Sequence, residues 1–171
     1  MTPQELNQGL SYITYGLYIV TTACDAQKNG MIVNTVFQVT AEPARVAISV
    51  NKACLTHELI SKSGVFAAMP LDQTATLPFI GTFGFRTGRT FDKFAKVPYT
   101  LGVLGCPIVK EHTLSYLEVA VEQTVDVGSH TLFIGEVKDV GILNSGAKAM
   151  TYDYYHYVIK GKTPAGATHA S

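Results

Sequence analysis

The sequence predicts a mainly β protein, an antiparallel barrel with a few short inserted helices, and three observations support this. Roughly seven short runs of strand-forming residues follow one another at close spacing. Only one or two amphipathic helical segments interrupt them. At 171 residues the chain is long enough for one domain and needs no second. We therefore expect a barrel and not a doubly wound fold.

The chain begins with short elements that lead into a long strand. Residues 4–10 are predicted to form a brief helix, and residues 17–23 a strand. Asn29 and Gly30 both tolerate positive φ, so we expect a hairpin turn at this pair. The turn would join the first strand to a second one over residues 31–40.

Residues 31–40 and 45–51 are predicted to be two strands joined through a turn at Pro43. On both strands the apolar side chains share one face and the polar side chains share the other. The apolar set is Met31, Val33, Phe37, Val39, Val46, Ile48 and Val50, and the polar set is Asn34, Gln38, Thr40, Ser49 and Asn51.

The polar face leads directly to Lys52, Thr56 and His57, where a helix is expected to begin. Small amides, hydroxyls, one cation and free N–H groups suit an anionic group that carries a flat polar ring. An ordinary hairpin with one face in solvent explains the same side chains. These residues alone leave both interpretations open.

The rest of the chain predicts one clear helix and several strands. The helix covers residues 55–62 and ends at Gly64, and a loop-rich segment with one helical turn follows at residues 74–96. The remaining strands are residues 65–69, 100–104, 115–125 and 130–140. Residues 1–160 are expected to form the domain, and residues 161–171 a flexible polar tail.

Three cations of the loop-rich segment, Arg86, Arg89 and Lys93, stand between aromatic residues. They could hold a phosphate, or their side chains could cover a sheet edge. His130 stands at the entry to the last strand after a Gly-Ser turn, and such places on a barrel rim are where ligands meet the scaffold. A histidine at a turn can equally have no chemical task.

The composition excludes several classes of protein. Charged residues are only 15% of the chain, and 13 basic residues balance 13 acidic ones. Because the basic residues form no dense block, neither nucleic acid nor an anionic membrane is an expected partner. A monomer with so little charge would expose much apolar surface, so we expect a homodimer. No apolar stretch reaches the ~20 residues that span a bilayer. The absence of a leader and the wide spacing of three cysteines indicate the cytoplasm.

The Gly161-Lys162-Thr163 run resembles the end of a phosphate-binding loop. Such a loop requires another glycine five residues earlier, where this chain has His156. It also requires a helix directly afterwards, but Pro164 follows. The run therefore does not predict that site.

Other glycine and metal-ligand patterns fail for similar reasons. Gly81, Gly84 and Gly88 do not match the dinucleotide fingerprint and lack the strand and helix that must flank it. Cys54 and His57 have the spacing of metal ligands, but no second pair completes four ligands. We expect no metal site.

Four stretches together resemble the flavin reductase-like FMN-binding split barrels, over nearly the whole chain. They are Thr35-x-Phe37 with Pro43, Ser49-Val50-Asn51-Lys52 with Thr56-His57-Glu58-Leu59-Ile60, Phe83-Gly84-Phe85-Arg86-Thr87-Gly88-Arg89 with Asp92-Lys93-Phe94, and Gly128-Ser129-His130-Thr131-Leu132-Phe133-Ile134-Gly135-Glu136-Val137. Within that family the chain is most similar to flavoredoxins and to the flavin domain of high-molecular-weight rubredoxins. The resemblance implies an antiparallel split barrel and a homodimer with one FMN per subunit near the interface.

The resemblance also implies roles for individual residues. Those expected to line the isoalloxazine ring are Asn29, Asn34, Thr35, Val36 and Phe37. Those expected to hold the ribityl chain and phosphate are Ser49, Val50, Asn51, Lys52, Thr56 and His57, with Arg86 and Lys93 adding positive charge. His130 is expected to be catalytic, beside the ring where the nicotinamide or a partner approaches. Two positions depart from the family: Ser129 replaces a frequent Asp, and Thr35 replaces an aromatic residue of flavoredoxins.

Three functions are compatible with these observations. The resemblance implies an FMN-dependent oxidoreductase that takes a hydride from NADH or NADPH and passes electrons to rubredoxin, another redox protein or free flavin. A second function is that of an FMN electron carrier that only a protein donor reduces. A third is that of a structural dimer that binds no cofactor and whose polar strand face is solvated.

Overall fold

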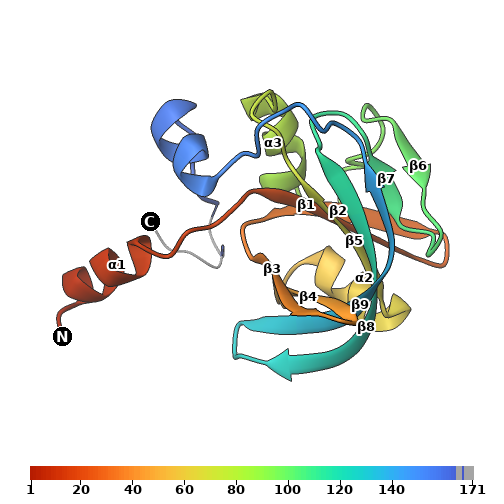
Figure 1. The fold of residues 1–171 in the computed structure, drawn as a ribbon, viewed down its shortest axis with the longest axis horizontal. Coiled ribbons are helices and arrows are strands. Elements are labelled where there is room, and N and C mark those ends of the chain that lie inside the picture. Colours follow the sequence, from red (N-terminus) through yellow and green to blue (C-terminus); the bar gives the residue numbers. More distant parts are fainter. Residues whose placement is uncertain (165–166, 168–171) are drawn as a thin grey trace.

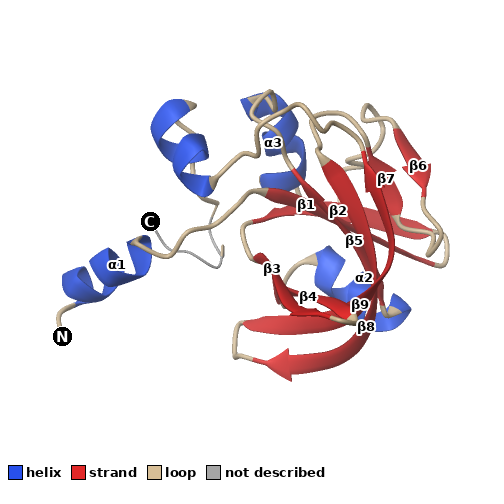
Figure 2. Cartoon of the chain, in the orientation of Figure 1, coloured by secondary structure: helices blue, strands red, loops and turns tan. Residues whose placement is uncertain are grey.

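The structure is a computed structural model that describes residues 1–164 and residue 167, and most of it is one curled antiparallel sheet (Figures 1 and 2). The strands follow the order β2-β1-β5-β8-β9-β4-β3 across this sheet, and β6 pairs separately with β7. The strands are β1 Tyr18–Cys24, β2 Gln27–Val33, β3 Val36–Ala41, β4 Ala44–Asn51, β5 Val65–Pro70, β6 Tyr99–Leu101, β7 Pro107–Val109, β8 Ser115–Asp126 and β9 His130–Ile142. The helices are α1 Pro3–Ser11, α2 Leu55–Ser63, α3 Leu77–Gly84 and the π-helical turn η1 Tyr154–Val158. The predicted fold class is confirmed.

The two edge strands of the sheet are consecutive in the chain. β2 ends at Val33 and β3 begins at Val36, so only Asn34 and Thr35 connect one edge to the other. Three residue steps span at most roughly 10 Å. The sheet must therefore curl until its edges approach each other, and because β2 and β3 do not pair, the barrel stays open along this seam.

The seam corrects the prediction of a single strand over residues 31–40. The chain leaves the first ladder at Asn34 because it must cross to the other edge. The predicted common apolar face is also wrong. Val33 is buried, whereas Phe37 and Val39 on the edge strand β3 are 48% and 44% exposed.

The hairpin between β1 and β2 turns at Asp25 and Ala26, and the prediction of a turn at Asn29 and Gly30 is wrong. Asp25 takes the positive φ, 54°, that the turn requires. Gly30 lies inside β2, where a Cβ would make a tight contact of 3.1 Å with the ring of Phe83.

The predicted strand over residues 100–104 is shorter in the structure. Only Tyr99–Leu101 pairs, and the chain then turns back to form β7, a strand that the sequence analysis missed. The turn is fixed by Glu118, which is fully buried and accepts hydrogen bonds from the backbone N–H groups of Leu104 and Cys106. A side chain on β8 therefore determines where β6 ends.

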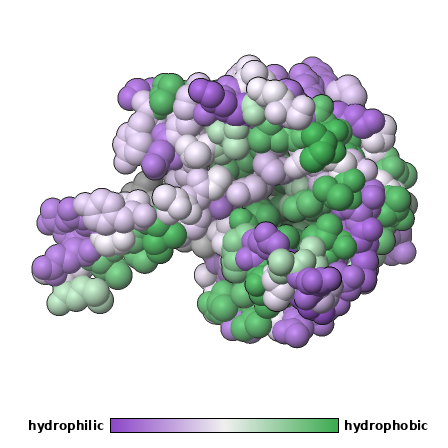
Figure 3. Space-filling view, in the orientation of Figure 1, coloured by the Kyte–Doolittle hydropathy of each residue, from purple (hydrophilic) through white to green (hydrophobic). Residues whose placement is uncertain are grey.

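The predicted helices are confirmed. α1 begins with a capping box between Thr2 and Glu5, and it projects from the body with no buried residue (Figures 1 and 3). α2 ends at Gly64, whose φ of 69° closes the helix with a left-handed residue. Among the helices of the described residues, none is long and apolar enough to cross a membrane.

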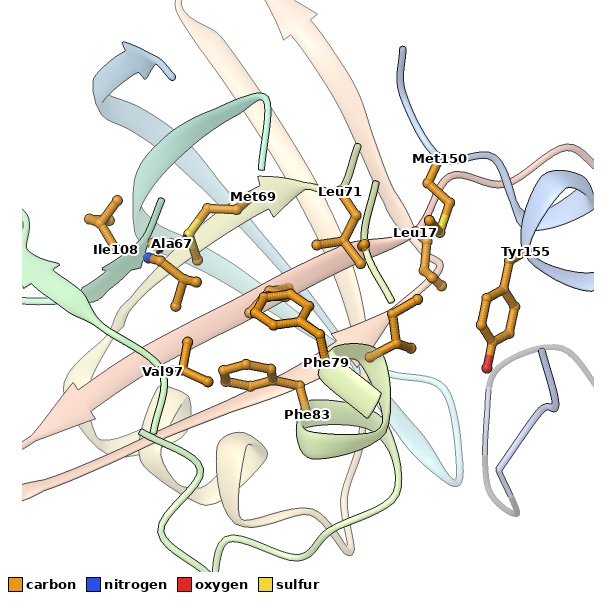
Figure 4. Packing of buried hydrophobic residues seen from close by; sticks show 14 of the residues in the cluster. Leu17, Ala67, Met69, Leu71, Phe79, Phe83, Val97, Ile108, Met150 and Tyr155 are labelled. Carbon is orange, nitrogen blue, oxygen red and sulfur yellow. Dashed lines mark hydrogen bonds between the residues drawn. The ribbon is translucent and has the colours of Figure 1, made fainter. Parts of the chain in front are cut away.

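Hydrophobic side chains cover both faces of the sheet. Because neighbouring strand residues point to opposite faces, Ile19 joins the cluster beneath α3 while Val20 joins the cluster inside the barrel. Figure 4 shows the first cluster, to which α3 contributes Phe79 and Phe83. The cluster extends to Tyr155 of η1, so one core holds both α3 and the C-terminal part of the chain.

Candidate functional site

A cleft of about 830 Å³ opens beside β2, at one edge of the seam. Its walls come from β2, the first turn of α2, the end of α3 with the loop after it, and the C-terminal segment. The lining residues include Asn29, Met31, Asn51, Cys54, Thr56, Phe85, Arg86, Lys93, Lys162 and Thr163. The cleft continues into a recess of about 60 Å³, because both cavities share Met31, Asn51 and Phe85.

The cleft carries positive charge. Arg86, Lys93 and Lys162 line it, and the described part of the chain contributes no Asp or Glu to its walls. Two further cations nearby are already paired, Arg89 with Glu58 and Lys52 with Asp126. The cleft is therefore suited to an anionic group.

The first turn of α2 adds backbone N–H groups to the same wall. Leu55 and Thr56 line the cleft, and the N-cap residue Cys54 makes no side-chain capping bond. The first N–H groups of a helix have no intrahelical partner and form the positive end of its dipole. Beside the cations, this helix end favours a phosphate.

Asn29 and Thr56 form a buried hydrogen bond in the wall of the cleft. Asn29 Nδ2 donates to Thr56 Oγ1 at 2.9 Å. Asn29 is 4% exposed and Thr56 is 0% exposed. The Thr56 hydroxyl still has its own proton to donate. Gly88 packs on the Asn29 amide so closely that a Cβ would overlap it, which explains the glycine.

Lys93 is buried, with 4% exposure, in the same wall. Its Nζ donates to the carbonyl oxygens of Gly30 at 2.8 Å and Phe83 at 3.0 Å, so it ties β2 to α3. Burial lowers the pKa of this ammonium to about 8, and the nearby Cys54 thiol opposes the shift. A third N–H remains for a ligand.

The recess combines apolar walls with a few polar side chains. Its polar side chains include Asn34, Ser49, Asn51 and His130. Asn51 and His130 lie opposite each other on β4 and β9, and His130 Nδ1 is 2.9 Å from Ser129 Oγ. A mainly apolar slot with a few polar groups suits a planar heterocycle.

Asn34 holds a buried hydrogen-bond donor without a protein partner. The residue is 7% exposed, and its Oδ1 accepts from the Thr35 hydroxyl at 3.0 Å. Its Nδ2 has no partner in the part of the chain that the structure describes. Because an unpaired buried N–H costs about 1–3 kcal/mol, a ligand carbonyl in the recess would be stabilising there.

The structure brings many of the predicted site residues together. Those that line the cleft or the recess are Asn29, Asn34, Ser49, Asn51, Thr56, Arg86, Lys93 and His130. Those that line neither are Thr35, Val36, Phe37, Val50, Lys52 and His57. For this second set, contact with FMN stays a prediction.

Three of the outlying residues have other contacts. Val50 is fully buried inside the barrel, and Lys52 Nζ bonds to Asp126 at 2.6 Å. His57 Nε2 lies 2.8 Å from Thr131 Oγ1. Burial, and then the charge of Lys52, lower the pKa of the His57 imidazole.

Sequence reasoning missed the C-terminal side of the site. Tyr152 and Tyr155 line the recess, and Lys162 lines both cavities. The signals in the sequence are the tyrosine-rich stretch over residues 152–157 and the Gly-Lys-Thr run, which does not match a phosphate-binding loop.

Comparison with known proteins agrees with this geometry. The family model described as flavin reductase like domain matches residues 10–160. A high molecular weight rubredoxin of Moorella thermoacetica is 46% identical over 160 residues, covering 94% of this chain and 69% of its own. A ferric-chelate reductase (NAD(P)H) of Archaeoglobus fulgidus is 44% identical over 156 residues, covering 91% of this chain and 92% of its own.

A solved structure shows the same fold. The NADH:FAD oxidoreductase of Streptomyces globisporus superposes with a TM-score of 0.77 at 24% identity, over 86% of each chain. The predicted resemblance to flavin reductase-like proteins and to high-molecular-weight rubredoxin is therefore confirmed. On its sequence and its fold alike, this chain belongs to the flavin reductase-like domain family.

Proposed function

We propose that this chain is an FMN-dependent oxidoreductase that accepts a hydride from NADH or NADPH and passes electrons to a redox partner. The proposal rests on the cationic cleft, to whose walls the described residues contribute no Asp or Glu. This cleft continues into the recess, where Asn34 Nδ2 has no hydrogen-bond partner among the described residues. The positive charge of the cleft suits the phosphate of FMN, and the mainly apolar walls of the adjoining recess suit contact with its planar ring.

The residues present suit this cofactor. Thr56, Lys93 and the first N–H groups of α2 would hold the phosphate, and Arg86 and Lys162 would add positive charge. Asn34 would donate to a carbonyl oxygen of the ring, and His130 would lie beside it. A bound flavin supplies the hydride and electron chemistry, while the protein supplies placement and electrostatics.

The relatives support the choice of electron acceptor. One is named a rubredoxin and the other a ferric-chelate reductase, and both names indicate an iron centre that takes up electrons. A rubredoxin-type protein and a ferric chelate are therefore the first acceptors to test, with free flavin as the third.

The first experiment measures which flavin binds. The purified chain, stripped of flavin, is titrated with FMN, FAD and riboflavin, and quenching of flavin fluorescence gives each Kd. FMN is expected to bind more tightly than riboflavin because only FMN carries the phosphate. Equal affinity for FMN and riboflavin, or no binding of any flavin, would contradict the proposal.

The second experiment separates the oxidoreductase from a carrier that only a protein donor reduces. The FMN-loaded protein is mixed anaerobically with NADH or NADPH, and flavin absorbance is followed by stopped flow. Bleaching with either nicotinamide supports the oxidoreductase. Colour that persists with both supports the carrier.

We also propose that the chain works as a homodimer through the edge strand β3. Phe37 and Val39 leave apolar surface on this unpaired edge, and such an edge favours association with a second copy. Thr35 and Val36, which line neither cavity of one subunit, stand at the start of the same strand. Light scattering should show a dimer, and a monomer at micromolar concentration would contradict this.

The proposed location is a reducing compartment, the cytoplasm. Cys24, Cys54 and Cys106 are all unpaired, and free cysteines of this kind are typical of reducing surroundings. Fractionation of cells that express the protein tests this directly, and recovery from another compartment would contradict it.

A further inference from the structure

Residues 162–164 form part of the walls of the site. Lys162 and Pro164 line the cleft and the recess, and Thr163 lines the cleft. The sequence predicted a flexible tail over residues 161–171, of which residues 165–166 and 168–171 lie outside the described structure. The described part makes hydrogen bonds with η1 and with Tyr152, and the flexibility of the tail stays a prediction.

Two tyrosines anchor this segment by their hydroxyl groups. Tyr155 Oη donates to the carbonyl oxygen of Lys162 at 2.8 Å, and Tyr152 Oη lies 2.9 Å from Thr163 Oγ1. Both tyrosines are buried, at 8% exposure or less, in the core that also holds α3. Figure 4 shows Tyr155 within that core. The anchors are therefore held in place by the packing of the core.

A histidine and a glycine complete the attachment. His156 Nδ1 lies 3.0 Å from the carbonyl oxygen of Gly161, and His156 Nε2 lies 3.2 Å from Thr163 Oγ1. Gly161 packs flat against the ring of Tyr155, where a Cβ would overlap the ring. Only glycine lets the backbone approach this closely.

These contacts have one consequence for the site. The hydrogen bonds hold the segment by its backbone and by Thr163, whereas the side chain of Lys162 is part of the cleft and recess walls. A ligand that fills both cavities would therefore contact Lys162 and Pro164, and these contacts must break when it leaves. The segment also adds a third cation to Arg86 and Lys93.

We propose that residues 161–164 form a latch that slows the release of bound flavin, so that the flavin stays resident and does not exchange in each turnover. This inference rests on the proposed function, because it concerns the same site. The latch opens when the hydroxyl anchors of Tyr152 and Tyr155 break, and it closes when they form.

The test measures the rate at which FMN leaves the full-length protein. FMN-loaded protein is mixed with an excess of an unrelated apoprotein that traps FMN, and the fluorescence change gives the release rate constant. Tyr155→Phe removes one hydrogen bond and keeps the ring, so release should be about fivefold faster. Tyr157→Phe is the matched control, because Tyr157 lies on the same helical turn but is 72% exposed, and its release rate should equal that of the wild type.

A second pair of variants tests the close backbone approach. Gly161→Ala pushes the latch off the Tyr155 ring and should speed release by about tenfold or more, whereas Gly146→Ala adds a Cβ in open space and should not. Thermal unfolding identifies any variant that fails to fold. If Gly161→Ala fails to fold, Tyr155→Phe decides the question alone.

The outcomes separate the latch from the proposed function. Faster release in Tyr155→Phe, with the wild-type rate in Tyr157→Phe, supports the latch. A wild-type release rate in a folded Tyr155→Phe variant overturns it. If the wild-type protein does not bind FMN, the proposed function itself is wrong. The titration of the wild type shows this before any variant is made.

Discussion

FMN affinity is expected to fall as the pH rises above about 8, because of Lys93. Burial lowers the pKa of this lysine to about 8, and the electrostatic interaction with Cys54 opposes the shift. A phosphate dianion bound in the cleft favours the protonated ammonium, so binding raises the pKa of Lys93. Below pH 8 the lysine is already charged. Above pH 8 binding must be accompanied by uptake of a proton, and the affinity decreases by linkage.

The size of the effect follows from the pKa. At about one pH unit above it, roughly one lysine in ten is protonated, so the Kd for FMN should be about tenfold weaker, or ~1.4 kcal/mol. Fluorescence titrations with FMN at several pH values measure this. Two titrations serve as controls: riboflavin, which has no phosphate, with the wild type, and FMN with the Lys93→Met variant. In both, the Kd should depend little on pH. A constant Kd for FMN, or a parallel weakening of riboflavin, would refute the reasoning.

Four other predictions concern single side chains. Asn34→Leu removes the unpartnered donor, so calorimetric titration should show FMN affinity reduced by about tenfold, while the flavin-free protein melts no lower than the wild type. Gly88→Ala displaces the Asn29 amide, so FMN affinity should fall, and wild-type affinity would contradict the packing. Glu118→Leu leaves the backbone N–H groups of Leu104 and Cys106 without their carboxylate partner. It should cost about 3 kcal/mol in urea unfolding, with FMN binding intact once folded. Burial lowers the pKa of the His57 imidazole, so the unfolded chain binds a proton at this residue more readily than the folded chain does. The free energy of unfolding should therefore decrease as the pH falls below about 6.5, and it should decrease less in His57→Gln.

The fold class was predictable because local patterns dominate most of the sheet. β4, α2, β8 and β9 lie close to the ranges that the strand-forming residues and the amphipathic spacing predict. The seam was not predictable from local patterns. Residues 31–33 and 36–40 all favour strand, and only the closure of the sheet forces the break at Asn34.

The site was predictable where its residues stand next to an element boundary. Thr56 lies in the first turn of a helix, Asn51 ends a strand and His130 begins one, so their positions follow from the elements. The pairing of Lys52 with Asp126 was not predictable, because it depends on the β8–β9 hairpin passing beside the end of β4. The C-terminal side of the site depends in the same way on η1 docking into the core, which a single sequence does not reveal.

The open seam explains why one strand, β2, organises the whole site. A closed barrel would pair this edge with another strand, but here β2 is left free on one side, and α2 and α3 both contact it. α2 contributes the positive helix end, and α3 is tied to β2 through Lys93. Asn34, where the chain leaves β2, contributes the unpartnered donor of the recess. The proposed anion binding, ring recognition and retention by the latch would therefore use segments far apart in sequence. These segments meet because the edge strand has no β neighbour on that side.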